Sequence, residues 1–204
     1  FRAASSRDFE LFPRGSRPTD DSILTLAVAE WILDGTDLVG LFKRRVAEHP
    51  MAGWGGMFSR WARTPDPTPY NSFGNGSAMR VSPAGFAASS LGEALDLAER
   101  SAGVTHDHPE GIKGAQAVAA AIYEARAGAS KERIRETVQT RFGYDLSRSA
   151  AEVAREATFD ETCPGSVPEA IIAFLDSSGY EDAVRTAVAY GADADTQACI
   201  AGGI

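Results

Sequence analysis

The sequence predicts an all-α fold. Apolar residues recur at helical spacing in segment after segment, and the alternation of apolar and polar residues that is typical of strands is almost absent. Capping residues, Pro and Gly also flank many of these segments. With 204 residues, of which 44% are hydrophobic, the chain is long enough to bury a sizeable core. We therefore expect one domain over residues 1–204.

The first helices are predicted in the N-terminal third. RPTDDSILTLAVAEWIL places two acids before an apolar run, so a helix should begin near Asp20. The segment DLVGLFKRRVAEH then puts Leu38, Leu41, Phe42 and Val46 on one face. Gly, Trp and Pro interrupt the pattern through PMAGWGGMFSRW, and a long Pro/Gly/Asn-rich loop, RTPDPTPYNSFGNGSAMR, follows. Long loops in compact domains commonly carry function, so this loop is a site candidate.

Two well-marked helices are predicted next. SLGEALDLAERSAG begins with a capping box made by Ser90 and Glu93. HPEGIKGAQAVAAAIYEARAG has Pro109 in its first turn and Gly128 as its stop. The Ala-rich face of this second segment should permit close packing of neighbouring helices.

Further helices are predicted to complete the fold. They are SKERIRETVQTRFG, SRSAAEVAREA, SVPEAIIAFLDSSG and YEDAVRTAVAYG, the third with a capping box at Ser166 and Glu169. No fixed-period repeat is present, which disfavours a solenoid. The apolar, helix-like pattern of ADTQACIAGGI runs to Ile204 without a cap or polar tail, so we expect the chain to be truncated at both ends.

Composition excludes several classes of protein. The formal charge of -8 disfavours a general nucleic-acid binder or a protein of anionic membrane surfaces. No window approaches the roughly 18 apolar residues of a membrane span. Cys163 and Cys199 do not make a disulfide framework, and both suit small buried positions. We expect a cytoplasmic protein with no membrane partner.

Paired aspartates at two predicted helix starts need something to offset their like charges. Near each end of the chain, two aspartates and one threonine stand at a predicted helix start: Thr19, Asp20 and Asp21, and Asp193, Asp195 and Thr196. One interpretation is two independent acidic caps. The other is one site, where four carboxylates would repel strongly unless a cation lay between them. Such hard oxygen ligands suit Mg²⁺, Mn²⁺ or Ca²⁺, and shared carboxylates can hold two ions about 3.5–4 Å apart.

Glycine-rich segments could hold a phosphate. In NSFGNGSAMR, the glycines let a ligand approach the backbone, Ser and Asn offer donors, and Arg80 follows closely. The alternative is a surface loop without a ligand. AGWGGMF is a second glycine-rich turn before a short helix, where free N–H groups could hold a diphosphate.

Histidines and aromatic residues add further candidates. In VTHDHPEG, His106 and His108 flank an aspartate at a helix start. A His-x-His pair can bind zinc, but a cap or a ligand contact suits this setting better, and His106 could also satisfy a buried carbonyl. Trp54, Tyr70 and Phe73 could stack on a base.

Six segments together resemble a known family. PTDDSILTLAVAEWIL, AGWGGMF, YNSFGNGSAMRVSPAGF, SAGVTHDHPEGIKGAQAVAAAIY, SVPEAIIAFL and GADADTQACIAGGI look like ADP-ribosylglycohydrolases of the dinitrogenase-reductase-activating type, in particular the compact bacterial members. The similarity spans nearly the whole chain. The resemblance implies a compact, orthogonal all-α bundle with a binuclear Mg²⁺ centre, or Mn²⁺ in its place, in a cleft that binds ADP-ribose.

The resemblance also implies roles for individual residues. The family's metal motifs match Thr19, Asp20, Asp21, Asp193, Asp195 and Thr196. Its diphosphate and ADP-ribose loops match Gly53, Gly55 and Gly56, and Asn71, Ser72, Phe73, Gly74 and Asn75, while its Thr-His motif places His106 at the ligand. Asp21 and Asp195 are the candidates for the catalytic base that orients or deprotonates water.

Two departures from the family pattern matter. A family Glu that ligates metal or helps catalysis would fall immediately before Phe1. Either the site has lost it, or it belongs to a part of the protein before Phe1. In GADADT, Ala192 and Ala194 replace a Gly and a Ser, while the ligating positions are kept.

We therefore expect a monomeric hydrolase that cleaves the ribosyl C1″ bond of ADP-ribosylated proteins or small molecules. The alternative is a catalytically impaired module that binds ADP-ribose. A metal-dependent hydrolase of another ribosylated small molecule is a third possibility.

Overall fold

The computed structural model describes residues 6–11 and 13–204, and within these ranges it contains twelve helices and no β-strand. The all-α prediction is confirmed. The helices are α1 (Asp20–Asp34), α2 (Leu38–Glu48), α3 (Gly56–Arg63), α4 (Gly76–Met79), α5 (Ser82–Ala87), α6 (Leu91–Gly103), α7 (Pro109–Arg126), α8 (Lys131–Phe142), α9 (Ala150–Glu156), α10 (Cys163–Leu175), α11 (Tyr180–Ala189) and α12 (Ala194–Gly203).

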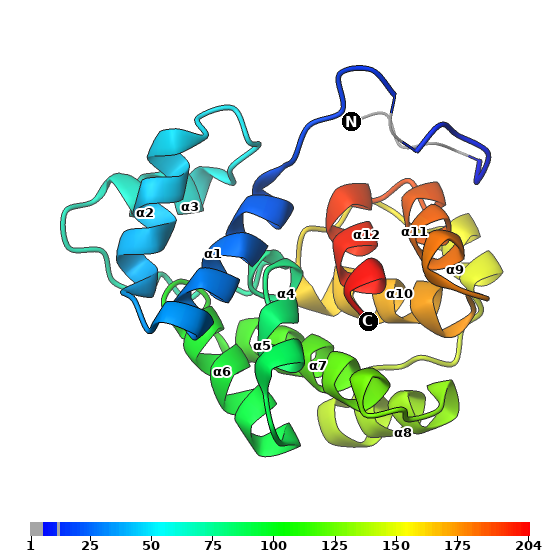
Figure 1. Cartoon of the computed structure of the whole chain (residues 1–204). Coiled ribbons are helices and arrows are strands. Elements are labelled where there is room, and N and C mark those ends of the chain that lie inside the picture. The colour runs from blue at the N-terminus through cyan, green and yellow to red at the C-terminus, as the bar shows by residue number, and fades with distance from the viewer. Residues whose placement is uncertain (1–5, 12) are drawn as a thin grey trace.

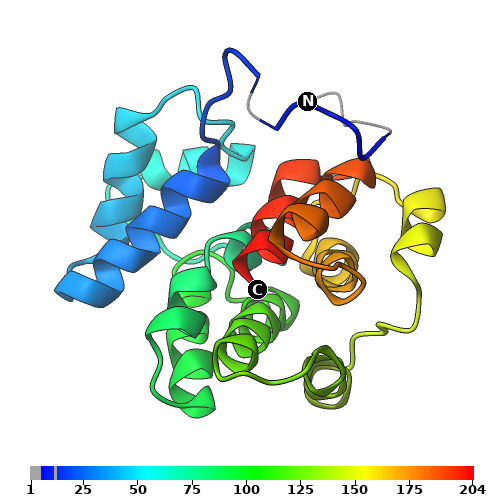
Figure 2. The ribbon, with the colours of Figure 1, turned by 45° about the vertical axis from the view of Figure 1, so that its right-hand side comes forward.

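Helix α7 is the centre of the packing. It contacts α4, α5, α6, α8 and α10. In both views, α12 lies between α1 and the pair formed by α10 and α11 (Figures 1 and 2). The first and last helices of the chain therefore pack side by side, although they are far apart in the sequence.

Two hydrophobic clusters hold these helices. The larger one surrounds the Ala-rich stretch of α7, in which every residue from Ala117 to Ile122 is buried. Small side chains let neighbours approach closely: a Cβ added at Gly114 would lie only 2.4 Å from Cys163 Sγ. The smaller cluster joins α1, α2 and α3 around Phe42, which makes edge-on contacts with Phe58 and Trp61.

Helix caps agree only partly with the sequence predictions. Ser90 caps α6, but Glu93 accepts from the Ser89 backbone N–H at 2.8 Å, so the predicted reciprocal box is incomplete. The second predicted box is wrong, because α10 begins at Cys163 under a Thr162 cap and Ser166 is buried inside the helix. Thr162 takes this role because its hydroxyl accepts from a backbone N–H of the first turn.

The start and end predicted for α7 are confirmed. Pro109 is its first residue, and Gly128 follows the last turn with a φ of +84°. A left-handed residue just past the end of a helix is the usual position for glycine. A complete capping box that the sequence analysis missed joins Ser149 and Glu152 at the start of α9.

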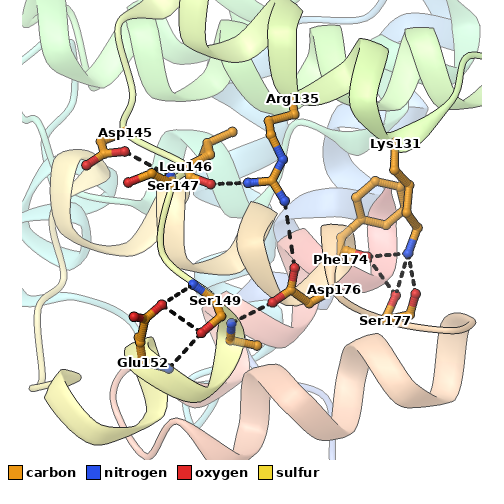
Figure 3. A network of polar contacts seen from close by, with 11 residues as sticks. Lys131, Arg135, Asp145, Leu146, Ser147, Ser149, Glu152, Phe174, Asp176 and Ser177 are labelled. Atoms are coloured by element: carbon orange, nitrogen blue, oxygen red, sulfur yellow. Dashed lines mark hydrogen bonds and ion pairs between the residues drawn. The ribbon is translucent and has the colours of Figure 1, made fainter.

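A polar network ties α8 to the ends of α9 and α10 (Figure 3). The Arg135 guanidinium donates to the Leu146 carbonyl and pairs with Asp176 at 3.7 Å. Asp176 also accepts from the Ala150 N–H at 2.7 Å, and Lys131 donates to carbonyls at the end of α10. The Asp176 bond satisfies an N–H at the start of α9, and the Lys131 bonds satisfy carbonyls at the end of α10.

None of the helices in the described part of the chain combines the length and the hydrophobicity needed to cross a bilayer.

The close packing of α5 on α7 gives a test of the fold. A Cβ at Gly85 would lie 2.6 Å from Ile122 Cβ and 2.8 Å from the Ala119 carbonyl oxygen. Because α7 cannot yield there without moving backbone, we expect Gly85→Ala to lower the free energy of unfolding by about 1–3 kcal/mol. Urea denaturation measures this loss.

Gly103→Ala is the matched control, because no heavy atom lies within 4 Å of the new Cβ at the end of α6. Its stability should equal or slightly exceed that of the wild type, since Ala favours a helix over Gly. Equal stability of Gly85→Ala and wild type would contradict the packing described here.

Candidate functional site

A cavity of about 350 Å³ opens where the starts of α1, α3 and α12 meet the loop before α4. Its lining residues are Asp20, Asp21, Gly53, Gly55, Gly56, Met57, Phe58, Tyr70, Ser72, Gly74, Asn75, Gly76, Met79, His106, Phe159, Glu161, Asp193, Asp195 and Thr196. The two acidic helix starts therefore lie in one cavity.

The carboxylates of α1 do not cap their helix. Thr19 is the N-cap, and its side chain makes no capping bond. Instead, its hydroxyl donates to Asp21 Oδ2 at 2.8 Å, while the Thr196 hydroxyl donates to Asp21 Oδ1 at 3.0 Å. Asp21 is buried and bonded from both ends of the chain. Thr19 does not line the cavity itself, but it orients a carboxylate that does.

The acids of α12 behave in the same way. Asp193 occupies the N-cap position without a side-chain capping bond. Its Oδ2 accepts from the Asn75 amide at 2.6 Å, and that amide also donates to Ser166 Oγ at 2.8 Å. The interpretation of two independent acidic caps therefore fails at both helices. Asn75 is buried, and its amide is committed to these two partners.

Burial and like charges shift the protonation of these acids. Burial, with the neighbouring charge of Asp21, raises the pKa of Asp20 to about 7. Burial, with the charge of Asp195, raises the pKa of Asp21 to about 6, although its threonine donors oppose the shift. Burial likewise raises the pKa of Asp193. Among the lining residues that the structure describes, none is Lys or Arg, so no side chain neutralises the cluster.

The donor set fits a divalent cation. Asp20, Asp21, Asp193 and Asp195 supply hard oxygen ligands. Burial and neighbouring carboxylates disfavour the charged forms of Asp20, Asp21 and Asp193, a cost that a bound cation would relieve. Within residues 6–11 and 13–204, no three His, Cys, Asp or Glu side chains form a ready-made metal-binding group. Hydrogen bonds from Thr19, Thr196 and Asn75 fix the orientation of two carboxylates that would bind the cation, those of Asp21 and Asp193.

Glycines line the wall next to Asp20. Gly53, Gly55 and Gly56 all reach the cavity, and Gly55 is the N-cap of α3. Gly53 has a φ of +95°, which a side chain would disfavour. The start of α3 thus presents backbone N–H groups beside the acids, where an anionic ligand group can bind.

The predicted ADP-ribose loop reaches the cavity only in part. Ser72, Gly74 and Asn75 line it, but Asn71 and Phe73 do not. Asn71 is exposed with a φ of +54°, and its N–H donates to Asp107 Oδ1 at 2.7 Å. Phe73 packs near the His108 ring, at 5.2 Å between centroids. The contacts of both residues therefore lie outside the cavity.

A loop from the second half of the chain completes the cavity. Asn75 N–H donates to the Glu161 carbonyl at 2.7 Å, and Cys163 N–H donates to the Phe73 carbonyl at 2.9 Å. This pairing brings Phe159 and Glu161 into the lining, and the sequence analysis missed both. Neither residue belongs to a recognisable motif, and only the long-range backbone pairing places them.

Of the aromatic candidates Tyr70 and Trp54, only Tyr70 lines the cavity. Tyr70 lines the cavity and packs on His106, with ring centroids 5.9 Å apart. Trp54 is turned into the α3 contact, where it stacks on Phe58 at 5.7 Å and donates to the His49 carbonyl. Trp54 therefore does not reach the cavity.

The cap favoured for the histidine motif is confirmed, and the expectation for Arg80 is corrected. His108 Nδ1 accepts from the Glu110 N–H at 3.1 Å and so caps α7, while only His106 lines the cavity. The pair is therefore split between two tasks, which argues against a zinc site. Arg80 does not line the cavity beside the glycine-rich loop that it follows in sequence. It is fully buried and donates to the Ser101 carbonyl and to Thr105 Oγ1.

Comparisons with known proteins find similarity to one family. The sequence model of a protein family described as ADP-ribosylglycohydrolase matches residues 2–204. A solved structure described as "ADP-ribosylglycohydrolase-related protein complex" is 26% identical, with a TM-score of 0.70, over 99% of this chain and 81% of that chain. No curated protein matches the chain.

The repulsion within the acid cluster is testable without substrate. In EDTA at pH 7.5, we expect Asp20→Asn to melt a few degrees above wild type. The raised pKa means that folding disfavours the carboxylate, so wild-type stability falls as the pH rises from about 4 through about 7. The amide lacks this charge. The difference in melting temperature should therefore shrink toward pH 4.

Asp34→Asn, at the exposed opposite end of α1, is the matched control and should lack this pH dependence. A lower melting temperature for Asp20→Asn in EDTA at pH 7.5 would show that the cluster is not under repulsive strain.

Proposed function

The chain belongs to the ADP-ribosylglycohydrolase family, and from this membership we propose that it hydrolyses the ribosyl C1″ bond of ADP-ribosylated proteins or small molecules at a binuclear Mg²⁺ centre. Mn²⁺ is an alternative metal. The observation that carries the proposal is the meeting of acids from α1 and α12 at one cavity, joined by the hydrogen bond from Thr196 to Asp21.

The carboxylates of Asp20, Asp21, Asp193 and Asp195 would hold the ions, with Thr19 and Thr196 at the flanks. Bound there, Mg²⁺ would neutralise the cluster and lower the pKa of a bound water. Cleavage of a ribosyl bond passes through an oxocarbenium-like state, so nearby carboxylates also favour the developing positive charge on the sugar.

A carboxylate must orient the attacking water or take its proton. Asp21 and Asp195 are the candidates. Both oxygens of Asp21 accept hydroxyl hydrogen bonds, which fixes this side chain and occupies lone pairs that a water would need. Asp195 lines the cavity, and no hydroxyl donates to its carboxylate in the described part of the chain, so we take it as the first candidate to hold the water.

The other walls of the cavity suit the ADP portion of the substrate. The glycines at the start of α3 offer backbone N–H groups to a diphosphate. Ser72 and His106 offer further polar groups, and Tyr70 and Phe159 offer aromatic faces to a base. Binding energy from this remote part positions the ribose over the acids.

Hydrolysis is tested by release of ADP-ribose from a panel of Arg-, Ser- and nucleobase-linked substrates with added Mg²⁺. We expect Asp195→Asn to lower kcat/KM by about 10²–10⁴-fold, the usual contribution of a general base. Asp20→Asn should lower it through lost metal affinity, so that excess Mg²⁺ or Mn²⁺ restores part of the rate. Asp34→Asn, outside the cavity, should stay near wild type.

Undiminished turnover in both Asp20→Asn and Asp195→Asn would contradict the proposal of a catalytic metal centre. Calorimetry with ADP-ribose separates the enzyme from a binding module. Tight binding without turnover of any substrate in the panel would support the module, and turnover would support the hydrolase.

A further inference from the structure

Arg80 is a buried charge outside the acid cluster. Its side chain is fully buried at the end of α4, and its guanidinium lies 4.6 Å from the centroid of the Phe42 ring. Two of its nitrogens, Nε and Nη1, have no hydrogen-bond partner within the described part of the chain. Burying an incompletely paired guanidinium is costly, so its remaining contacts call for a physical explanation.

Those contacts lead toward the cavity. Arg80 Nη2 donates to the Ser101 carbonyl at 2.7 Å and to Thr105 Oγ1 at 2.9 Å. Thr105 Oγ1 in turn lies 2.7 Å from His106 Nδ1. Arg80, Thr105 and His106 are all buried, so water does not compete strongly for these bonds. A continuous relay runs from the guanidinium to the imidazole ring.

The direction of each hydrogen bond follows from the chemistry of the groups. Arginine only donates, so Thr105 Oγ1 accepts from Arg80. The threonine hydroxyl has one proton, and His106 Nδ1 is the acceptor within reach among the described residues. If Nδ1 carried a proton instead, the hydroxyl proton of Thr105 would be buried without a partner, which is costly. Nδ1 is therefore the acceptor, and the ring proton lies on Nε2.

The other ring nitrogen, Nε2, faces Gly74 and Gly76 in the cavity wall. His106 lines the cavity, and Cβ atoms added at Gly74 and Gly76 would lie 3.5 Å and 3.3 Å from Nε2. Burial and the charge of Arg80 hold the pKa of His106 well below its usual value. The ring is thus neutral at physiological pH and presents a single N–H donor.

We propose that Arg80 and Thr105 are positioning residues that fix the neutral Nε2–H tautomer of His106, so that the ring donates a hydrogen bond to an oxygen of the bound ligand. The tautomer follows from the protein's own contacts. Only the identity of the ligand, ADP-ribose, rests on the proposed function. Without the relay, the ring could present Nε2 as an acceptor, which would repel the lone pairs of a phosphate oxygen.

The ring nitrogens are tested directly by ¹⁵N NMR of ligand-free protein with labelled histidine at pH 7, with His106 assigned by His106→Gln. We expect the Nδ1 shift of an unprotonated nitrogen and the Nε2 shift of a protonated one. An Nδ1–H tautomer or an imidazolium in the wild type would overturn the proposal, and this measurement needs no variant of the relay.

Calorimetry with ADP-ribose tests the consequence for binding. Thr105→Val removes the hydroxyl and nearly keeps the shape, so both tautomers should appear in the NMR spectrum and affinity should fall about threefold to tenfold, the effect of one hydrogen bond. Thr105→Ser keeps the hydroxyl and should restore both readouts. Thr105→Val with the wild-type tautomer and wild-type affinity would overturn the positioning role.

Failure of the proposed function has a different signature. If wild-type protein shows the predicted tautomer but does not bind ADP-ribose, the ligand half of the proposal fails together with the proposed function. If the protein binds ADP-ribose and hydrolyses its substrates while His106 carries its proton on Nδ1, the proposed positioning by Arg80 and Thr105 is wrong and the proposed hydrolase activity is supported.

Discussion

The site depends on the hydrogen bond between Thr196 and Asp21, because it joins the last helix of the chain to the first. Burial makes the charged forms of these aspartates costly, and their mutual repulsion adds to that cost. A fold that gathers such groups must stabilise them by its packing. The contacts of α12 with α1, α4, α10 and α11 provide that packing at the wall of the cavity.

Hydrogen bonds also position the residues on the other walls of the cavity. Asn75 holds Asp193 with its side chain and the Phe159–Glu161 loop with its backbone, so one residue links the acids to the far wall. His106 is oriented by Thr105, and Thr105 by Arg80. His106 is therefore held by two residues that do not line the cavity, which preorganises this wall.

Helical periodicity predicted the fold class, because it is a local signal. The paired aspartates at two helix starts left open whether the two pairs meet, and only the resemblance to a known family implied that they form one site. The long-range pairings were not predictable. Phe159 and Glu161 reach the cavity through backbone bonds to Phe73 and Asn75, which no local pattern encodes. Arg80 was a phosphate candidate only because it follows the glycine-rich loop in sequence, but its side chain is fully buried at the end of α4. The box at Ser166 failed because Thr162, four residues earlier, starts the helix.

The central claim is that aspartates of α1 and α12 share divalent ions. It is tested most directly by anomalous diffraction from crystals of the protein soaked with Mn²⁺ and ADP-ribose. The account predicts anomalous peaks within the cavity, with ligands from both Asp20 or Asp21 and Asp193 or Asp195. Peaks bound by the acids of only one helix, or an ADP-ribose complex whose acids bind no ion, would contradict it.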